Sequence, residues 1–445
     1  MSELLEVANK VAGWAREGEQ VEAYVARSNS TSVRVFDAEI ESLSTSQSEG
    51  VAVRVVRNGH MGFAYAGSLD DDVLQETLAE ARDNAEFSEP DEWVGLPEPD
   101  GVPYVEMDLW RDSLTAVPTE KKIDFALQLE KELKARDSRI MVVPVAAYSD
   151  GWGEEAIASS LGISSWQRAT QCVLSTYCVA MENGDTQTGF GFSVGREHSA
   201  LDLDKTVGDA AARATRLLGA KKPKSRRLPV ILDPMVTDDF VSVIGYPLTG
   251  EALVKGRSLF ANRVGESVGS PLVTLVSDPT DTRSLAADPV DAEGLASRRV
   301  PLIDKGVLTG FVHNSYTARR TGTHSTGSAV RSMKTAPGVG CRAVTLEPGT
   351  KSQEELMAEL GEGVLVLSVS GLHSGVNPVS GDFSTGAEGV VFRNGQPAEP
   401  VREFTISSTL QRMLSDVTAV GNDVEELPSG LSMSVAIGEV SVSGD

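Results

Sequence analysis

Apolar and polar positions alternate with two periods along this chain, and the local period predicts helices and strands in turn. Apolar residues spaced three or four apart predict amphipathic helices at 4–14, 74–85, 119–133 and 202–218. Between these helices, alternating or β-branched runs predict strands at 21–26, 31–36, 50–63, 140–148, 157–163 and 169–181. The first half of the chain is therefore expected to have a mixed α+β fold.

Short sequence signals predict turns and helix ends in that first half. Asn58-Gly59 and Asn183-Gly184 mark hairpin turns, and an Asn-Gly pair supplies both positive-φ positions of a type I′ turn. Ser68 is expected to cap the helix that follows it, and Gly219 is placed to end the helix at 202–218.

The second half has fewer long helices, more glycine and more extended runs. Strands are expected at 228–233, 271–277, 299–312 and 363–370, with a hairpin at 390–406 and a final period-two run at 432–442. A short helix or helical turn is expected at 235–245. Ser352 and Glu355 form a capping box before a further helix, which Gly361 closes. We therefore expect an N-terminal mixed α+β domain at residues 1–225 and a C-terminal strand-rich domain with a large sheet at residues 226–445.

Length and charge narrow the partners that this protein is expected to have. At 445 residues the chain is too long for one hydrophobic core. Its formal net charge of −24 repels phosphate backbones, so nucleic acid is not an expected partner. The one dense basic run, at 221–227, lies between a predicted helix and a predicted strand and is interpreted as a solvated linker.

Location follows from three further observations. No apolar run approaches the roughly 20 residues that span a membrane, and the start has no signal-peptide pattern. Cys172, Cys178 and Cys341 are an odd number, which does not make a disulfide framework, and the first two are interpreted as buried strand residues. A cytoplasmic protein without membrane contact is therefore expected.

Residues 374–423 contain a dense cluster of glycine and small polar residues. Five glycines from Gly375 to Gly395 lie among Ser, Asn and Asp side chains, which tolerate or cap unusual backbone angles. This density predicts a shaped loop that leads into a sheet, and a run of ordinary turns is the alternative interpretation. No Gly-x-Ser-x-Gly elbow, Walker loop or Rossmann fingerprint is present in the sequence.

The five histidines do not form a recognisable metal motif, because no two have the i, i+4 spacing of a helical pair. His324 and His373 each lie in a Ser/Gly loop and are the better candidates for function, whereas His60 and His198 are expected to be exposed. Residue types alone therefore indicate a two-domain α+β protein without an evident catalytic centre.

Several short motifs resemble, in order, those of the TldD/PmbA family, and specifically its PmbA (TldE) branch. They include Val230-Ile-Leu-Asp-Pro234, Asp291-Ala-Glu-Gly-Leu-Ala-Ser-Arg-Arg299, Ser374-Gly-Val-Asn-Pro-Val-Ser-Gly-Asp-Phe-Ser384 and Val420-Gly-Asn-Asp423. The resemblance covers roughly 200 residues of the second half and extends more loosely into the first half. It implies a two-domain fold of the TldD/PmbA type.

The resemblance also implies a heterodimeric zinc peptidase. Its TldD-like subunit carries a His-Glu-x-x-x-His helix just after the strand that corresponds to 230–232, and a cysteine ligand after Gly-Asn-Asp. This chain instead has Met235-Val-Thr-Asp-Asp-Phe-Val-Ser-Val-Ile244 at the first place, with no His or Glu, and no cysteine follows Asp423 at the second. The implied role is a TldE-like subunit without catalytic residues or metal ligands, with zinc in its TldD-like partner.

The same resemblance implies that an extended peptide binds by strand addition inside a chamber that both subunits enclose. The residues expected to line the chamber are Ser374, Gly375, Asn377, Asp382, Phe383, His324 and His373. Two other readings stay open: a homo-oligomeric peptide-binding or scaffold protein without protease activity, and an independent enzyme that uses His324 or His373 with a new metal. General peptide turnover and maturation of a peptide-derived natural product are both compatible with the sequence.

Overall fold

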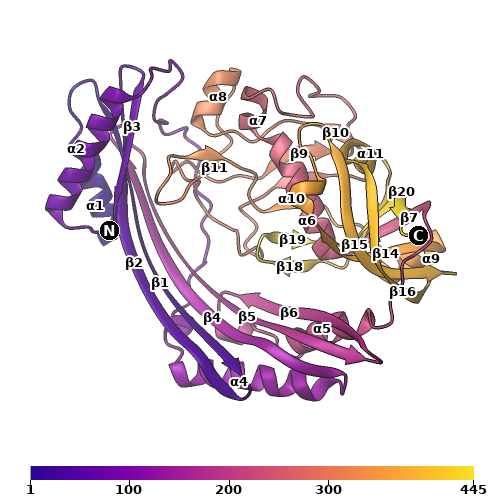
Figure 1. Cartoon of the computed structure of the whole chain (residues 1–445). Helices are drawn as coiled ribbons and strands as arrows, with labels where there is room; N and C mark the ends of the chain where they lie inside the picture. The colour runs from indigo at the N-terminus through magenta and orange to yellow at the C-terminus, as the bar shows by residue number, and fades with distance from the viewer. Residues whose placement is uncertain (1) are drawn as a thin grey trace.

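A computed structural model describes residues 2–445, and its first half is organised by one long, curved antiparallel sheet (Figure 1). Its strands are β1 (Gln20–Phe36), β2 (Glu39–Arg57), β3 (His60–Ala66), β4 (Ile140–Ser159), β5 (Ser164–Glu182) and β6 (Asp185–Gly195). Their order across the sheet is β3-β2-β1-β4-β5-β6. The predicted α+β fold class is confirmed.

Two predicted strand boundaries are wrong. The strands expected at 21–26 and 31–36 are one strand, because β1 continues through the polar residues 28–32 while pairing with both β2 and β4. The strand expected at 157–163 is the end of β4 followed by a turn. In both places backbone pairing in the middle of the sheet continues through side chains that give no hydrophobic signal.

Helices cover the two ends of one face of this sheet. Helices α1 (Glu3–Ala12) and α2 (Asp71–Phe87) pack on one end, and α4 (Thr119–Arg136) and α5 (Leu203–Arg216) pack on the other. A short helix, α3 (Asp112–Thr115), precedes α4. Asp70, and not Ser68, is the N-cap of α2, and the Ser68 hydroxyl instead donates to the Asp70 carboxylate at 2.9 Å.

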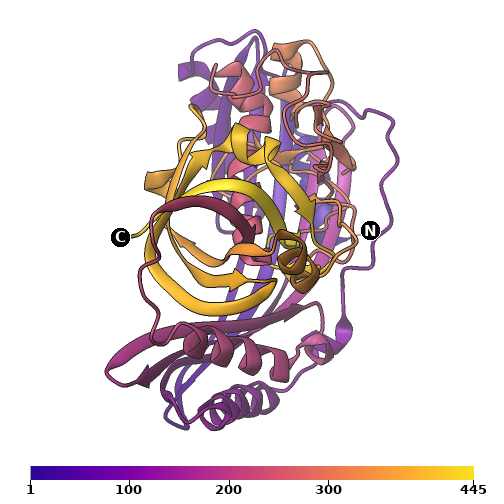
Figure 2. The same cartoon turned by 90° about the vertical axis from the view of Figure 1, so that its right-hand side faces the viewer.

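The second half of the chain forms a barrel, seen end-on in Figure 2. Its strands are β7 (Arg226–Leu232), β14 (Glu362–Ser370), β15 (Asp382–Arg393), β16 (Gln396–Thr409) and β20 (Val435–Ser443). Strand β16 pairs with β20 and closes the sheet, β17 (Val417–Val420) adds to β20, and only β7 and β14 pair in parallel. Closure removes exposed edges, which antiparallel sheets otherwise need to protect.

Helices α6 (Pro234–Gly245) and α9 (Gln353–Leu360) pack against the barrel strands. The segment expected to be a short helix or turn is a 12-residue helix, α6, with Asp233 as its N-cap and Pro234 in its first turn. The capping box of Ser352 and Glu355 at the start of α9 is confirmed.

Short elements connect these parts. They are α7 (Gly250–Val254), β8 (Leu275–Ser277), β9 (Val300–Asp304), β10 (Val307–Leu308), α8 (Ser315–Thr321), β11 (Ala329–Val330), β12 (Gly338–Val339), β13 (Val344–Leu346), α10 (Leu372–Gly375), α11 (Leu410–Ser415), β18 (Glu425–Leu427) and β19 (Gly430–Ser432). The strand expected at 271–277 is only its last three residues, and the run expected at 432–442 is divided between β19 and β20. No helix among residues 2–445 is both long and apolar enough to cross a membrane.

The face of the long sheet that carries no helices packs against the second half. Tyr24, Ala52 and Ile157 of the sheet form a small apolar cluster with Leu295. Figure 1 shows the sheet curving around the connecting segments and the barrel.

Candidate functional site

Helix α6 carries carboxylates toward the hairpin of β18 and β19. Asp238 and Asp239 are both half-buried, and the Ser429 hydroxyl, in the turn of that hairpin, donates to Asp238 Oδ2 at 2.8 Å. Burial raises the pKa of both carboxyl groups above their usual range. The helix that directly follows β7 therefore presents an acidic surface.

Asp233, the N-cap of α6, lies where the barrel meets the edge of the long sheet. Its pKa is raised to about 6, mainly by burial and also by the charge of the neighbouring Glu425. The amide of Met235, which donates to Asp233 Oδ1 at 3.3 Å, and the charges of Arg213 and Arg216 on α5 act in the opposite direction. Charged side chains from both halves of the chain therefore act on the Asp233 carboxylate.

The side chains of this acidic surface do not fit a zinc site of imidazole and thiolate ligands. Asp233, Asp238, Asp239 and Glu425 offer only carboxylate oxygens, whereas protein zinc sites favour His nitrogen and Cys sulfur. Among residues 2–445 no group of three or more His, Cys, Asp and Glu side chains has a geometry suited to a metal ion. Cys341 lies at the other end of α6, where its thiol donates to the Gly245 carbonyl at 3.3 Å.

The loop predicted to line a chamber is an ordered structure after β14. The Asn377 side chain accepts hydrogen bonds from the amides of Val379 at 2.9 Å and Ser380 at 3.2 Å. The Ser380 hydroxyl donates to Asp382 Oδ2 at 2.6 Å. Gly375 is required for close approach, because a Cβ there would lie 1.9 Å from the Ser384 carbonyl oxygen.

The structure separates the other predicted site residues. His373 and Ser374 are exposed on α10 in this same loop. Phe383 is only 3 % exposed, and its ring packs edge-on against Phe240 of α6 with centroids 6.4 Å apart. His324 is exposed after α8 and lines a different pocket, which also contains Arg298 and Arg319. Whether these residues line a peptide chamber stays a prediction.

Two other histidines are less exposed than expected. His198 is half-buried, with its ring centroid 4.9 Å from that of Phe125 and 5.6 Å from that of Tyr148. His60 is also half-buried, and its Nδ1 lies 2.8 Å from the Ser88 carbonyl oxygen. The expectation that both are exposed is therefore wrong, because each is covered by residues distant in sequence.

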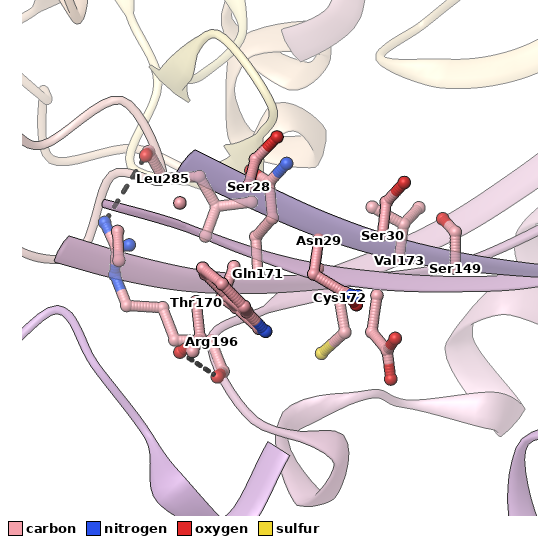
Figure 3. A pocket seen from close by; sticks show the side chains of 15 residues that line it. Ser28, Asn29, Ser30, Ser149, Thr170, Gln171, Cys172, Val173, Arg196 and Leu285 are labelled. Atoms are coloured by element: carbon pink, nitrogen blue, oxygen red, sulfur yellow. Dashed lines mark hydrogen bonds between the residues drawn. The ribbon is translucent and has the colours of Figure 1, made fainter. Parts of the chain in front are cut away.

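A cavity of about 440 Å³ is lined by residues of β1, β4 and β5 together with Arg196 and Leu285 (Figure 3). Figure 3 shows the Ser28, Ser30 and Ser149 side chains extending from the same side of the strands. The Arg196 guanidinium, at one end, donates to the Ser284 carbonyl at 2.9 Å. Four hydroxyl side chains, those of Ser28, Ser30, Ser149 and Thr170, are therefore part of a lining that also includes Trp152 and Arg196.

Sequence reasoning missed both the cavity wall and the acidic surface. The serines at 28, 30 and 32, and those at 44, 46 and 48, alternate with period two, which places each set on one face of a strand. That period is the signal that could have identified the wall. The approach of Arg213 and Arg216 to Asp233 has no such signal, since it depends on how the two halves pack.

Family models match nearly the whole chain in three consecutive parts. The model described as PmbA/TldA metallopeptidase domain 1 matches residues 21–85, the central domain matches 112–218, and the C-terminal domain matches 225–444.

Named relatives and solved structures agree with these models. The Metalloprotease PmbA of Escherichia coli O157:H7 is 26 % identical over 448 residues, covering 100 % of this chain and 96 % of that protein. A Metalloprotease PmbA homolog of Haemophilus influenzae is 25 % identical, covering 97 % and 93 %. The crystal structure of TldE from Thermococcus kodakarensis superposes with a TM-score of 0.89 at 25 % identity, covering 99 % of each chain.

Proposed function

This chain belongs to the PmbA/TldD metallopeptidase family, and we propose that it is the non-catalytic, TldE-like subunit of a two-chain zinc peptidase. The observation that supports the proposal most directly is which metal-binding side chains α6 has. At the position where the family resemblance places a His-Glu-x-x-x-His helix, α6 contains neither His nor Glu. The carboxylates of Asp238 and Asp239 are the acidic groups that it offers instead, and Phe240 is packed in the core against Phe383.

The region after Asp423 supports the same assignment. The Asp423 carboxylate is used within the fold, where it accepts hydrogen bonds from the Ser434 amide at 3.1 Å and hydroxyl at 2.6 Å. Strand β18 then begins with Glu425, a carboxylate instead of the thiolate that the resemblance implies for the zinc-binding subunit. In this proposal the zinc, which supplies an activated water for peptide hydrolysis, is held by the partner chain.

We propose that this chain contributes one wall of the chamber in which an extended peptide is held. The cavity of about 440 Å³ supports this role, because the hydroxyls of Ser28, Ser30 and Ser149 in its lining can hydrogen-bond to a peptide backbone without selecting particular side chains. We further propose that residues 1–225 and 226–445 are two domains, the second of them strand-rich, and that the protein is cytoplasmic.

The experiment is co-expression with a homologue from the same organism that carries the His-Glu-x-x-x-His helix. The purified sample is measured by light scattering for mass, by elemental analysis for zinc and by hydrolysis of an unstructured peptide. We expect a one-to-one complex with one zinc ion, and hydrolysis by the complex but not by this chain alone. His→Ala substitutions in the helix of the partner are expected to abolish both zinc binding and hydrolysis.

Two outcomes would contradict the proposal. A stable oligomer of this chain that does not bind the homologue would support the homo-oligomeric binding protein. Stoichiometric zinc and hydrolysis in this chain alone would support an independent enzyme, and His324→Ala and His373→Ala would then test its ligands.

A further inference from the structure

A second cavity, of about 620 Å³, opens at one end of the barrel. Each of the five closed strands contributes one apolar residue to its floor: Leu228, Val364, Val391, Val401 and Val442. All five are buried, with exposed fractions of 1 % to 7 %. Figure 2 looks along the barrel and shows the segment after α5 reaching the rim of the ring. The mouth of a barrel is a common place for a ligand site.

Cationic side chains form the rim of this cavity. Lys221, Lys222, Lys224 and Arg226 come from the basic linker, and Arg393 comes from the end of β15. Backbone hydrogen bonds fix the linker in this position: the Lys221 amide donates to the Pro400 carbonyl at 3.4 Å, and the Asp445 amide donates to the Pro223 carbonyl at 3.0 Å. The backbone of the linker is therefore held at the mouth of the barrel, while six of its seven residues are exposed to solvent, as the sequence predicts.

Two of the rim cations lack a counter-charge. Arg226 pairs with Glu362 and Arg393 pairs with Glu399, both within the cavity, and Lys222 lies 3.8 Å from Glu403. In the part of the chain that the structure describes, neither Lys221 nor Lys224 has a carboxylate within 4 Å. With Glu403 included, five rim cations lie beside three carboxylates, which leaves a local positive charge in a protein of net charge −24.

We propose that this cavity binds one small organic anion per chain, a molecule with an apolar body and a carboxylate or phosphate head. The five apolar residues receive the body, and Lys221 and Lys224 neutralise the head at the rim. A bare inorganic anion would leave the apolar floor unused, and a neutral apolar molecule would leave the two lysines without a partner.

The site is distinct from the acidic surface at α6. Leu228, in the cavity floor, is the third residue of β7, and Leu232, which precedes α6, is its last. Four residues of extended strand separate them by about 13 Å. A ligand at the barrel mouth therefore does not occupy the proposed peptide path.

The test is isothermal titration of the full chain with octanoate, with hexanoate, acetate, octanol and inorganic phosphate as comparisons. We expect one octanoate per chain, with affinity increasing roughly fourfold for each added methylene that is buried. Octanol, acetate and phosphate are expected to bind at least about tenfold more weakly than octanoate. Octyl phosphate then identifies the head group, since tighter binding than octanoate assigns the site to a phosphate and weaker binding assigns it to a carboxylate.

The matched variants are Lys221→Glu/Lys224→Glu at the rim and Lys121→Glu/Lys131→Glu on exposed positions of α4. Both double variants change the net charge of the protein equally. Comparing them therefore separates an effect of the cavity rim from an effect of overall charge. We expect the rim variant to weaken octanoate binding about tenfold or more and the α4 variant to leave it unchanged, with both melting as the parent does. Equal binding of octanol and octanoate, equal weakening by both variants, or several octanoates per chain would each overturn the proposal.

Discussion

Arg54 of β2 and Glu293 of the segment before α8 form a fully buried ion pair, 3.4 Å apart, that joins the long sheet to the second half of the chain. Glu22 of β1 completes the contact by pairing with Arg54 at 2.5 Å and with Arg331 at 2.8 Å. Glu293 also accepts hydrogen bonds from the Ser315 amide and hydroxyl at the start of α8. One charged cluster thus fixes a sheet, a loop and a helix relative to one another.

Arg54→Ala is expected to destabilise the protein by about 3 to 5 kcal/mol, because it leaves Glu22 and Glu293 buried without their common cation. The measurement is the free energy of unfolding in urea. Arg27→Ala is the matched control, since Arg27 on the neighbouring strand pairs with Glu3 and Glu49 near solvent. It is expected to cost no more than about 1 kcal/mol. Equal losses in the two variants would show that the buried cluster does not join the halves.

Asp233→Asn is expected to change how stability depends on pH. The carboxyl group has a pKa of about 6 in the folded protein and an ordinary value of 3.8. Between these values the unfolded chain releases the proton and the folded chain keeps it, so the stability that the protonated group contributes is lost as pH rises toward 6 and beyond. The variant keeps a good N-cap, and its gain in stability over the parent should grow from less than about 1 kcal/mol at pH 4 to about 3 kcal/mol at pH 7. Unfolding in urea across this range, with Asp124→Asn on exposed α4 as control, checks the difference.

Features set by neighbouring residues were predictable from the sequence. Asn58 and Gly59 have φ of 51° and 79°, as a type I′ turn requires, and the capping box at Ser352 forms as expected. Features set by tertiary packing were not. The polar run at 28–32 continues a strand only because β2 and β4 flank it, and Asp233 has its high pKa because residues far along the chain bury it.

The candidate site also has some features that the sequence predicts and others that depend on tertiary packing. The absence of His from the sequence at 234–245 was readable directly, whereas the burial of Phe383 against Phe240 depends on how α6 packs on the barrel. The basic linker shows the limit of a local interpretation. Its charge and its place between α5 and β7 were correct, but its position over an apolar floor follows from closure of the barrel.

Gly208→Ala is expected to stabilise the protein by about 0.5 to 1 kcal/mol, because alanine loses less conformational entropy than glycine in a helix interior. Gly208 lies in the middle of α5, and a Cβ added there meets no atom within 4 Å. The melting temperature and the urea midpoint should both rise. A decrease would show that the Gly208 backbone is not in the helical conformation of α5.

Gly375→Ala is expected to have the opposite effect. The added Cβ would lie 1.9 Å from the Ser384 carbonyl oxygen, so the loop must move away from β15. A loss of about 1 to 3 kcal/mol is expected, as for other overpacked positions. Increased amide hydrogen exchange should be confined to residues 372–384. Exchange that increases equally in the long sheet would instead indicate global destabilisation.

Ser30→Trp is expected to impair the proposed complex without affecting its zinc. Ser30 lies opposite Ser46 on β2 and Gly151 on β4, so a larger side chain displaces little on the sheet and projects into the cavity of about 440 Å³. Peptide hydrolysis by the complex should fall at least about tenfold in kcat/KM, with zinc content and complex mass unchanged, because the indole occupies space that the peptide requires. Ser199→Trp, at an exposed position outside the cavity, is the matched control and should retain full activity. Full activity in Ser30→Trp as well would show that the peptide does not cross this cavity, and loss of complex mass would show that the serine wall contacts the partner instead.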